Sequence, residues 1–277
     1  MNRLSREKQI EVLNALVEGN SIRATVRMTG VAKNTISKLL LEIGEVCQNY
    51  HDEHVQNLNS KRIQCDEIWN FVYAKEKNLP ADLQGHESYG SIWTWTAIDA
   101  DSKLMVSYLV GKRDGYWAYT FMKDVASRVS NRIQLTTDAH SAYFTAVRES
   151  FGENVDYAML IKKYGKAPED RQAEVRYSPA VCTGIEKKPK IGNPDPDEIS
   201  TSYVERQNLT MRMSMRRFTR LTNGFSKKIE NLEAAVALHF MHYNFVRIHQ
   251  TIRCTPAMEA GITNRLWTMR DIVDLLP

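Results

Sequence analysis

Three acidic residues occupy positions in the sequence where a carboxylate could take part in chemistry. Asp66 lies in IQCDEIWNFVY, an alternating stretch rich in β-forming residues that predicts a strand over residues 63–73. Asp138 follows IQLTT, which predicts a short buried strand, and ligands of open α/β sheets collect beyond the carboxyl ends of strands. Glu205 lies near the start of a long predicted helix. Asp66 is the least ordinary of the three, because an ionised carboxylate inside a sheet is costly unless it is paired or bound to a metal.

Converging carboxylates favour a site for hard divalent cations. Three of them, from a central strand, a neighbouring strand end and a helix, could hold two Mg²⁺ ions, for which Mn²⁺ is a plausible substitute. Two such ions can activate a nucleophile and stabilise the leaving oxygen of a phosphodiester. Most acids are simply solvated, and the neighbouring Glu67 is expected on the opposite face of the strand. Asp99 and Asp101 also compete, but they flank a predicted hairpin turn, where Asp is common.

A basic stretch follows Glu205 and predicts contact with a phosphate backbone. Residues 206–228 contain no acid, and the helix predicted over 202–221 places Glu205, Asn208, Arg212 and Arg216 on one face. The alternative is an ordinary exposed basic face. Arg212, about two helical turns after Glu205, would lie beside a phosphate held by the metal. The DNA-binding candidates of this stretch are Arg206, Asn208, Arg216, Arg217, Arg220, Lys227 and Lys228.

The first 50 residues predict a helix-turn-helix module. Helices are expected over residues 6–18, 22–28 and 32–47, with a tight turn at Thr29-Gly30-Val31 between the second and the third. An alternative is a three-helix module for protein interaction. The side chains expected to reach DNA are Arg23, Arg27, Lys33, Asn34, Thr35 and Lys38.

The remaining elements predict an α/β fold with a mixed five-stranded sheet and flanking helices. Strands over 91–99 and 104–110 form a hairpin, and strands over 133–137 and 155–161 alternate with helices over 116–129 and 142–151. The predicted organisation is a helix-turn-helix domain (1–50), a linker (51–60), a catalytic domain (61–230) with a Pro-rich insertion loop (162–200), and a C-terminal helical tail (231–277) packing on it.

Composition narrows the class of protein. With 277 residues, 43% hydrophobic and 25% charged, the chain reads as globular rather than disordered, fibrous or membrane-spanning. We expect a cytoplasmic protein without a membrane partner, associated with the nucleoid when bound to DNA. A net charge of +4 by itself is weak support for nucleic-acid binding, and the clustering of the basic residues is more informative. The tail offers His239, His242, His249 and Cys254, but no cysteine pair completes a zinc site, so packing or DNA-facing roles are favoured.

Three motifs together resemble the DDE-type transposases of bacterial insertion sequences, most closely the insertion-sequence-one type. They are CDEIWNFV around Asp66, TTDAHSAY around Asp138, and SYVERQNLTMRMSMRRFTRLTNGFSKK around Glu205. The tail FMHYNFVRIHQTIRCTPAMEAGI resembles the ends of several other insertion-sequence transposases. This resemblance implies a ribonuclease-H-like fold with Asp66, Asp138 and Glu205 as catalytic metal ligands and Arg212 as the basic residue on the same helical face.

By the same resemblance, the reaction is hydrolysis of a DNA strand to free a 3′-OH, which then attacks target DNA. The partners would be the terminal inverted repeats and the target DNA, bound by a homodimer or a higher oligomer. Two alternatives stay open. One is a nuclease of the same fold that does not join strands, and the other is a DNA-binding protein without catalysis, such as a decayed transposase.

Overall fold

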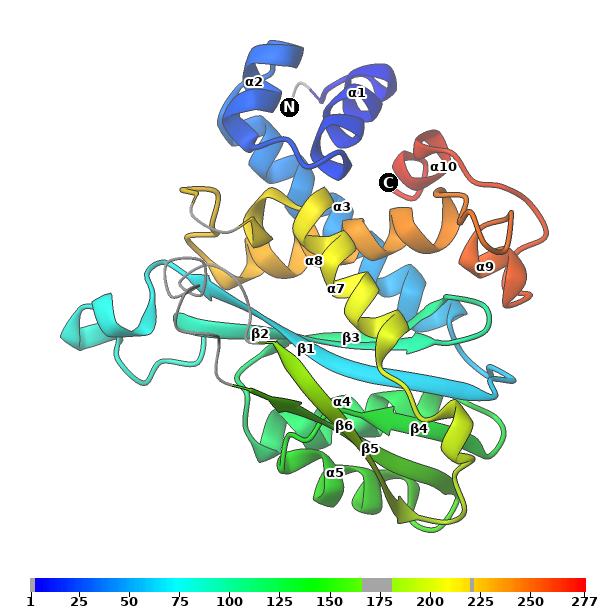
Figure 1. Cartoon of the computed structure of the whole chain (residues 1–277). Helices are drawn as coiled ribbons and strands as arrows, with labels where there is room; N and C mark the ends of the chain where they lie inside the picture. Colours follow the sequence, from blue (N-terminus) through cyan, green and yellow to red (C-terminus); the bar gives the residue numbers. More distant parts are fainter. Residues whose placement is uncertain (1–2, 166–180, 220–221) are drawn as a thin grey trace.

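The computed structural model describes residues 3–165, 181–219 and 222–277 (Figure 1). The helices of this part of the chain are α1 (Arg6–Val17), α2 (Ile22–Thr29), α3 (Lys33–His54), α4 (Gly115–Arg128), α5 (Ala142–Phe151), α7 (Ser202–Ser214), α8 (Ile229–Phe245), α9 (Pro256–Glu259) and α10 (Met269–Val273). The strands are β1 (Arg62–Val72), β2 (Gly90–Asp99), β3 (Met105–Gly111), β4 (Ile133–Thr137), β5 (Val155–Tyr164) and β6 (Cys182–Ile191). None of the helices described is both long and apolar enough to cross a membrane.

The strands form one mixed sheet in the order β3-β2-β1-β4-β5-β6. The β2–β3 hairpin pairs antiparallel with one side of β1, and β4 and β5 continue the other side in parallel. The first five strands are those predicted, and their order with β1 at the centre is that of a ribonuclease-H-like fold.

A sixth strand corrects the prediction of five. β6 pairs antiparallel with β5 at the edge of the sheet and lies within residues 162–200, which the sequence suggested to be a Pro-rich loop. Most of its side chains are exposed, so it lacks the apolar alternation that identifies a strand. Pro189 is tolerated there because an edge strand leaves one row of its backbone groups unpaired.

Helices cover both faces of the sheet. α4 and α5 lie on one face, and α3, α7 and α8 lie on the other (Figure 1). Trp95 of β2 points toward the first layer, where its ring lies 5.8 Å from Phe121 of α4 and 5.5 Å from Tyr143 of α5. α7 contacts β1 and β2 on the opposite face, so this helix can bring its side chains to the centre of the sheet.

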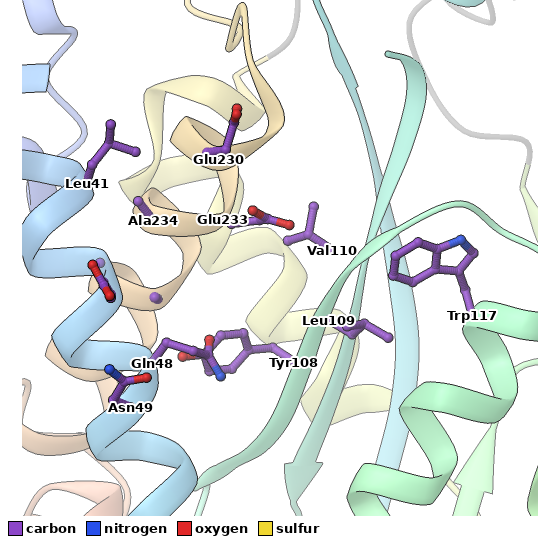
Figure 2. A pocket seen from close by; sticks show the side chains of 13 residues that line it. Leu41, Gln48, Asn49, Tyr108, Leu109, Val110, Trp117, Glu230, Glu233 and Ala234 are labelled. Carbon is purple, nitrogen blue, oxygen red and sulfur yellow. The ribbon is translucent and has the colours of Figure 1, made fainter. Parts of the chain in front are cut away.

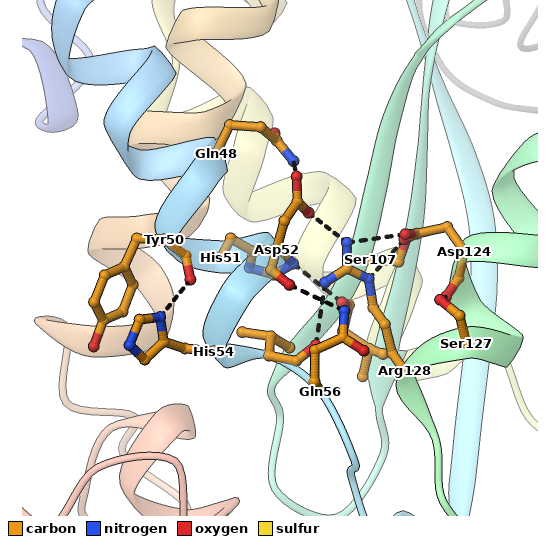
Figure 3. Close-up of polar contacts among 12 residues, drawn as sticks. Gln48, Tyr50, His51, Asp52, His54, Gln56, Ser107, Asp124, Ser127 and Arg128 are labelled. Atoms are coloured by element: carbon orange, nitrogen blue, oxygen red, sulfur yellow. Dashed lines mark hydrogen bonds and ion pairs between the residues drawn. The ribbon is translucent and has the colours of Figure 1, made fainter.

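The long helix α3 connects the N-terminal helices to the sheet. It continues to His54 instead of ending near residue 47, because buried Cys47 and His51 extend its apolar face into the segment predicted as a polar linker. Its end is fixed by Arg128 of α4, whose guanidinium donates to Asp124, to Asp52 at 2.5 Å and to the Val55 carbonyl at 3.1 Å (Figure 3). This network connects the end of α3 to α4.

The C-terminal helices pack against the N-terminal ones. α8 runs along α3, and α10 contacts α1. The ring of Trp267 lies 5.0 Å from both Tyr50 of α3 and Phe245 of α8. The tail therefore packs on the N-terminal helices as well as on the sheet, to which α8 adds a contact at β3.

Candidate active site

The structure brings Asp66 and Asp138 together at the centre of the sheet. β1 and β4 pair in parallel, and their pairing ends at Cys65 and Thr137. The next residue of each chain segment is one of the two acids, so both carboxylates lie where the neighbouring strands cease to pair. With Glu67, they offer carboxylate oxygens that all lie within 4.8 Å of one another.

Asp66 points toward α7 and is half-buried. Its Oδ2 accepts a hydrogen bond from Nδ2 of Asn208, at 2.8 Å. Burial, followed by the negative charges of Asp138 and Glu67, raises the pKa of Asp66 to about 7. Both causes disfavour the ionised form of the Asp66 carboxyl.

Glu67 is a member of this group that sequence reasoning left out. It contacts the other helical layer, as strand alternation requires, where its Oε2 accepts from the Tyr143 hydroxyl of α5 at 2.8 Å. Its other oxygen pairs with Arg113, whose guanidinium also lies 3.6 Å from Asp138. Burial and the charge of Asp138 raise the pKa of Glu67. The adjacent Asp-Glu pair is the only sequence signal for it, because Arg113 and Tyr143 come from distant segments.

Glu205 lies apart from the three clustered carboxylates. It sits in the first turn of α7, where it pairs with Lys162 of β5 and accepts a hydrogen bond from the Thr201 hydroxyl. Its charge still contributes to the raised pKa of Asp66, after those of Asp138 and Glu67. Of the three predicted acids, the structure therefore clusters Asp66 and Asp138, whereas Glu205 is outside the cluster and paired to a lysine.

The other predicted residues of α7 occupy different environments. Arg212 is half-buried on the same helix as Glu205. Asn208, predicted to contact DNA, is buried and holds Asp66 instead. Arg206 is exposed. The change for Asn208 follows from the close approach of α7 to β1, which the sequence could not reveal.

The predicted basic stretch beyond α7 is only partly exposed. Arg216, Lys227 and Lys228 are exposed, and the Lys227 ammonium lies 4.8 Å from the centre of the Phe225 ring. Arg217 is less available than predicted, because its Nε donates to the Ser226 hydroxyl at 2.8 Å and burial lowers its pKa to about 10. Arg220 lies outside the described residues. The helix itself ends at Ser214, short of the predicted 221.

The N-terminal helices present the predicted polar face to solvent. Ser21 caps α2 through a hydrogen bond to Ala24, and Gly30 ends it with φ of 70°, a conformation that suits glycine in the tight turn before α3. All six side chains expected to reach DNA are exposed, namely Arg23, Arg27, Lys33, Asn34, Thr35 and Lys38. Whether they bind DNA stays a prediction.

A pocket of about 500 Å³ lies away from the acids, between α3, α8 and the edge strand β3 (Figure 2). Three carboxylates line it, from Glu45, Glu230 and Glu233, and the described residues around it include no Lys or Arg. Burial and the charge of Glu230 raise the pKa of Glu233. This pocket is therefore unsuited to a polyanion such as DNA.

The clustered acids suit a divalent cation. Asp66, Glu67 and Asp138 supply oxygen ligands, and Arg113 is the single basic side chain paired with them in the described part of the chain. Three carboxylates against one guanidinium leave an excess of negative charge, in agreement with the raised pKa of Asp66. It is the only group of acids, histidines and cysteines with this geometry among the described residues.

Comparisons with known proteins return likenesses of structure only. No protein-family model and no curated protein matches the chain. The structure is similar to a piggyBac transposase synaptic complex with hairpin DNA, with a TM-score of 0.38 and 10% identity over 98% of this chain and 70% of that one. It is also similar to the Mos1 strand transfer complex, with a TM-score of 0.25 and 11% identity over 88% of this chain and 78% of that one.

Both structural similarities are weak, so the functional conclusion rests on the residues of the site. Neither supports the insertion-sequence-one type in particular.

Proposed function

We propose that the protein is a DDE-type transposase that cleaves DNA at the ends of its own element and joins them to target DNA. The observation that carries this proposal is the meeting of Asp66 and Asp138 where paired β1 and β4 separate, beside the helix that bears Glu205. The ribonuclease-H-like strand order and the basic residues after Glu205 support it. The motifs around the three acids favour the insertion-sequence-one type.

Asp66 and Asp138 would hold Mg²⁺, or Mn²⁺ in its place, with Glu67 beside them and Glu205 completing a second metal site. When bound, two such ions lower the pKa of a nucleophilic water or hydroxyl and stabilise charge on the leaving oxygen of a phosphodiester. Glu205 has first to exchange its ion pair with Lys162 for this role.

The protein's own side chains position these acids. Asn208 donates to Asp66 and fixes one of its oxygens, while Tyr143 and Arg113 hold Glu67 from the opposite layer. Arg212 lies seven residues after Glu205, about two helical turns along α7, where a guanidinium could contact a phosphate next to the scissile bond. These roles require α7 to remain packed against β1.

DNA would run along α7 and the segment that follows it. Arg206, Arg216, Lys227 and Lys228 are exposed there, and neutralising phosphates with such side chains makes binding strongly salt-dependent. The exposed polar residues of α2 and the start of α3 would read the terminal inverted repeats in the major groove. Two ends must be processed together, so we expect a homodimer or higher oligomer on DNA, acting in the cytoplasm at the nucleoid.

The reaction would begin with hydrolysis of a DNA strand and continue with attack of the freed 3′-OH on target DNA. A strand-transfer assay tests this, with a labelled duplex taken from the DNA that flanks the coding sequence and a plasmid as target. Joined products support the transposase. Cleavage without joining indicates a nuclease of the same fold. If neither occurs and calorimetry shows no Mg²⁺ or Mn²⁺ binding that depends on Glu205, the protein is a non-catalytic DNA-binding protein.

A further inference from the structure

A second cavity, of about 450 Å³, lies on the other flank of α7 from Glu205. α7 lies across the sheet (Figure 1). Glu205 pairs with Lys162 of β5, whereas Arg206 and Gln207 line the cavity together with residues of the β2–β3 turn and of the segment after α8. Its wall also contains Lys103 and Arg247, and the described residues that line it include no Asp or Glu.

The positive charges of this cavity have no carboxylate partners. Lys103 is only 6% exposed, and its Nζ donates to the Ala100 carbonyl and lies 3.5 Å from the centre of the Tyr203 ring. Arg206 and Arg247 are exposed at the mouth and, within the described chain, form no ion pair. A buried ammonium without an anion is unfavourable, so the cavity lacks the negative charge that would neutralise its cations.

Two neutral groups in the same cavity also lack partners. Nε2 of Gln207, a side chain that is 3% exposed, and Nδ1 of His249 are buried and make no hydrogen bond within the described chain. Burial first, then the charges of Lys103 and Arg247, lower the pKa of His249, so this imidazole lies near the same two cations. An amide N–H without an acceptor is rare in a buried position, and it calls for a ligand that accepts hydrogen bonds.

We propose that this cavity binds a phosphate group of the DNA backbone, on the flank of α7 opposite Glu205. A phosphodiester supplies the negative charge and the acceptor oxygens that Lys103, Arg206, Gln207 and Arg247 lack. DNA is favoured over a small anion because Arg206 and Arg247 are exposed at the mouth of the cavity, where a polyanion can reach both of them from solvent. The proposal rests on the proposed function, and it adds a DNA contact built from Lys103, Gln207 and Arg247.

The test measures binding of the full-length protein to labelled duplex DNA over a range of salt concentrations. Arg247→Gln removes one cation at the mouth, and Arg148→Gln is the matched control, an exposed arginine of α5 on the opposite face of the sheet. For Arg247→Gln, the log–log slope of affinity against salt should become shallower by about 0.9, the value for one phosphate contact. The control should keep the wild-type slope.

A second variant distinguishes the loss of a cavity contact from a change in the fold. Gln207→Glu is nearly isosteric but places a carboxylate in the cavity, so it should weaken DNA binding more than Arg247→Gln does. Circular dichroism checks that both variants are folded.

Three outcomes would overturn the proposal. Wild-type slopes in both cavity variants remove the cavity from the DNA path and leave the proposed function standing. Absence of salt-dependent DNA binding by the wild-type protein removes the proposed function as well. Calorimetric binding of inorganic phosphate that Arg247→Gln abolishes, together with an unchanged DNA slope, assigns the cavity to a free anion.

Discussion

The raised pKa of Asp66 makes the stability of the metal-free protein depend on pH in an unusual direction. Its folded-state pKa of about 7 lies above the ordinary value of 3.8. The unfolded chain therefore releases this proton more easily than the folded one. The favourable contribution is fully present below the ordinary pKa and is lost as pH rises through 7, so Asp66 should contribute less to the stability of the wild-type protein toward neutral pH.

The size of this effect follows from the shift. Each unit of pKa corresponds to about 1.4 kcal/mol, so the ionised carboxylate costs the folded state about 4 kcal/mol near pH 8 and between ~1 and ~2 kcal/mol near pH 5. Asp66→Asn removes the charge and keeps an oxygen that can accept the hydrogen bond from Asn208. The variant should therefore gain about 3 kcal/mol over the wild type between pH 5 and pH 8.

Urea unfolding in the presence of a chelator, followed by circular dichroism at both pH values, measures this difference. Asp156→Asn is the matched control, because the hydrogen bond from Arg132 lowers the pKa of Asp156 and gives it the opposite dependence. Its carboxylate stabilises the fold at high pH and loses that effect as pH falls through the lowered pKa. Equal or lower stability of Asp66→Asn at pH 8, relative to the wild type, would refute the raised pKa assigned to Asp66.

Two further substitutions test how the site is held in place. Asn208→Leu removes the donor to Asp66, which should cost about 1–3 kcal/mol in urea unfolding and weaken Mn²⁺ binding in a calorimetric titration; unchanged binding would exclude its positioning role. Gly44→Ala places a Cβ 2.4 Å from Ala234, so it should separate α3 from α8 and cost about 1–3 kcal/mol. Gly115→Ala meets nothing within 4 Å and serves as its control, so equal melting temperatures of the two variants would contradict this packing.

The sequence predicted most of the sheet because its strands carry a local signal. β1 alternates, and β4 is a short segment of β-forming residues followed by an acid, so Asp66 could be expected within a strand and Asp138 at the end of another before their pairing was known. β6 has no such pattern because most of its side chains are exposed. The sequence predicted too early an end for α3. The burial of His51 depends on contacts with distant β3, including a hydrogen bond to the Val106 carbonyl.

The partners of the acids could not be predicted, because they come from distant segments. Because Asn208 lies on a basic helix, the sequence predicts that it contacts DNA. The packing of that helix against β1 instead directs the Asn208 side chain to Asp66. The pairing of Glu205 with Lys162 depends on β5, and that of Glu67 with Arg113 depends on the loop after β3. A helical face can be read from spacing, but what lies against it is set by the tertiary fold.

The measurement that tests the central claim most directly is divalent-cation-dependent strand cleavage by the wild type, Asp138→Asn and Asp156→Asn. The substrate is a duplex from the DNA that flanks the coding sequence, with Mg²⁺ or Mn²⁺ added after a chelator. Cleavage by the wild type and Asp156→Asn, and none by a folded Asp138→Asn, is the predicted result. Cleavage by Asp138→Asn at the wild-type rate, or cleavage that persists in the chelator, would contradict the assignment of the clustered acids as the metal-dependent active site.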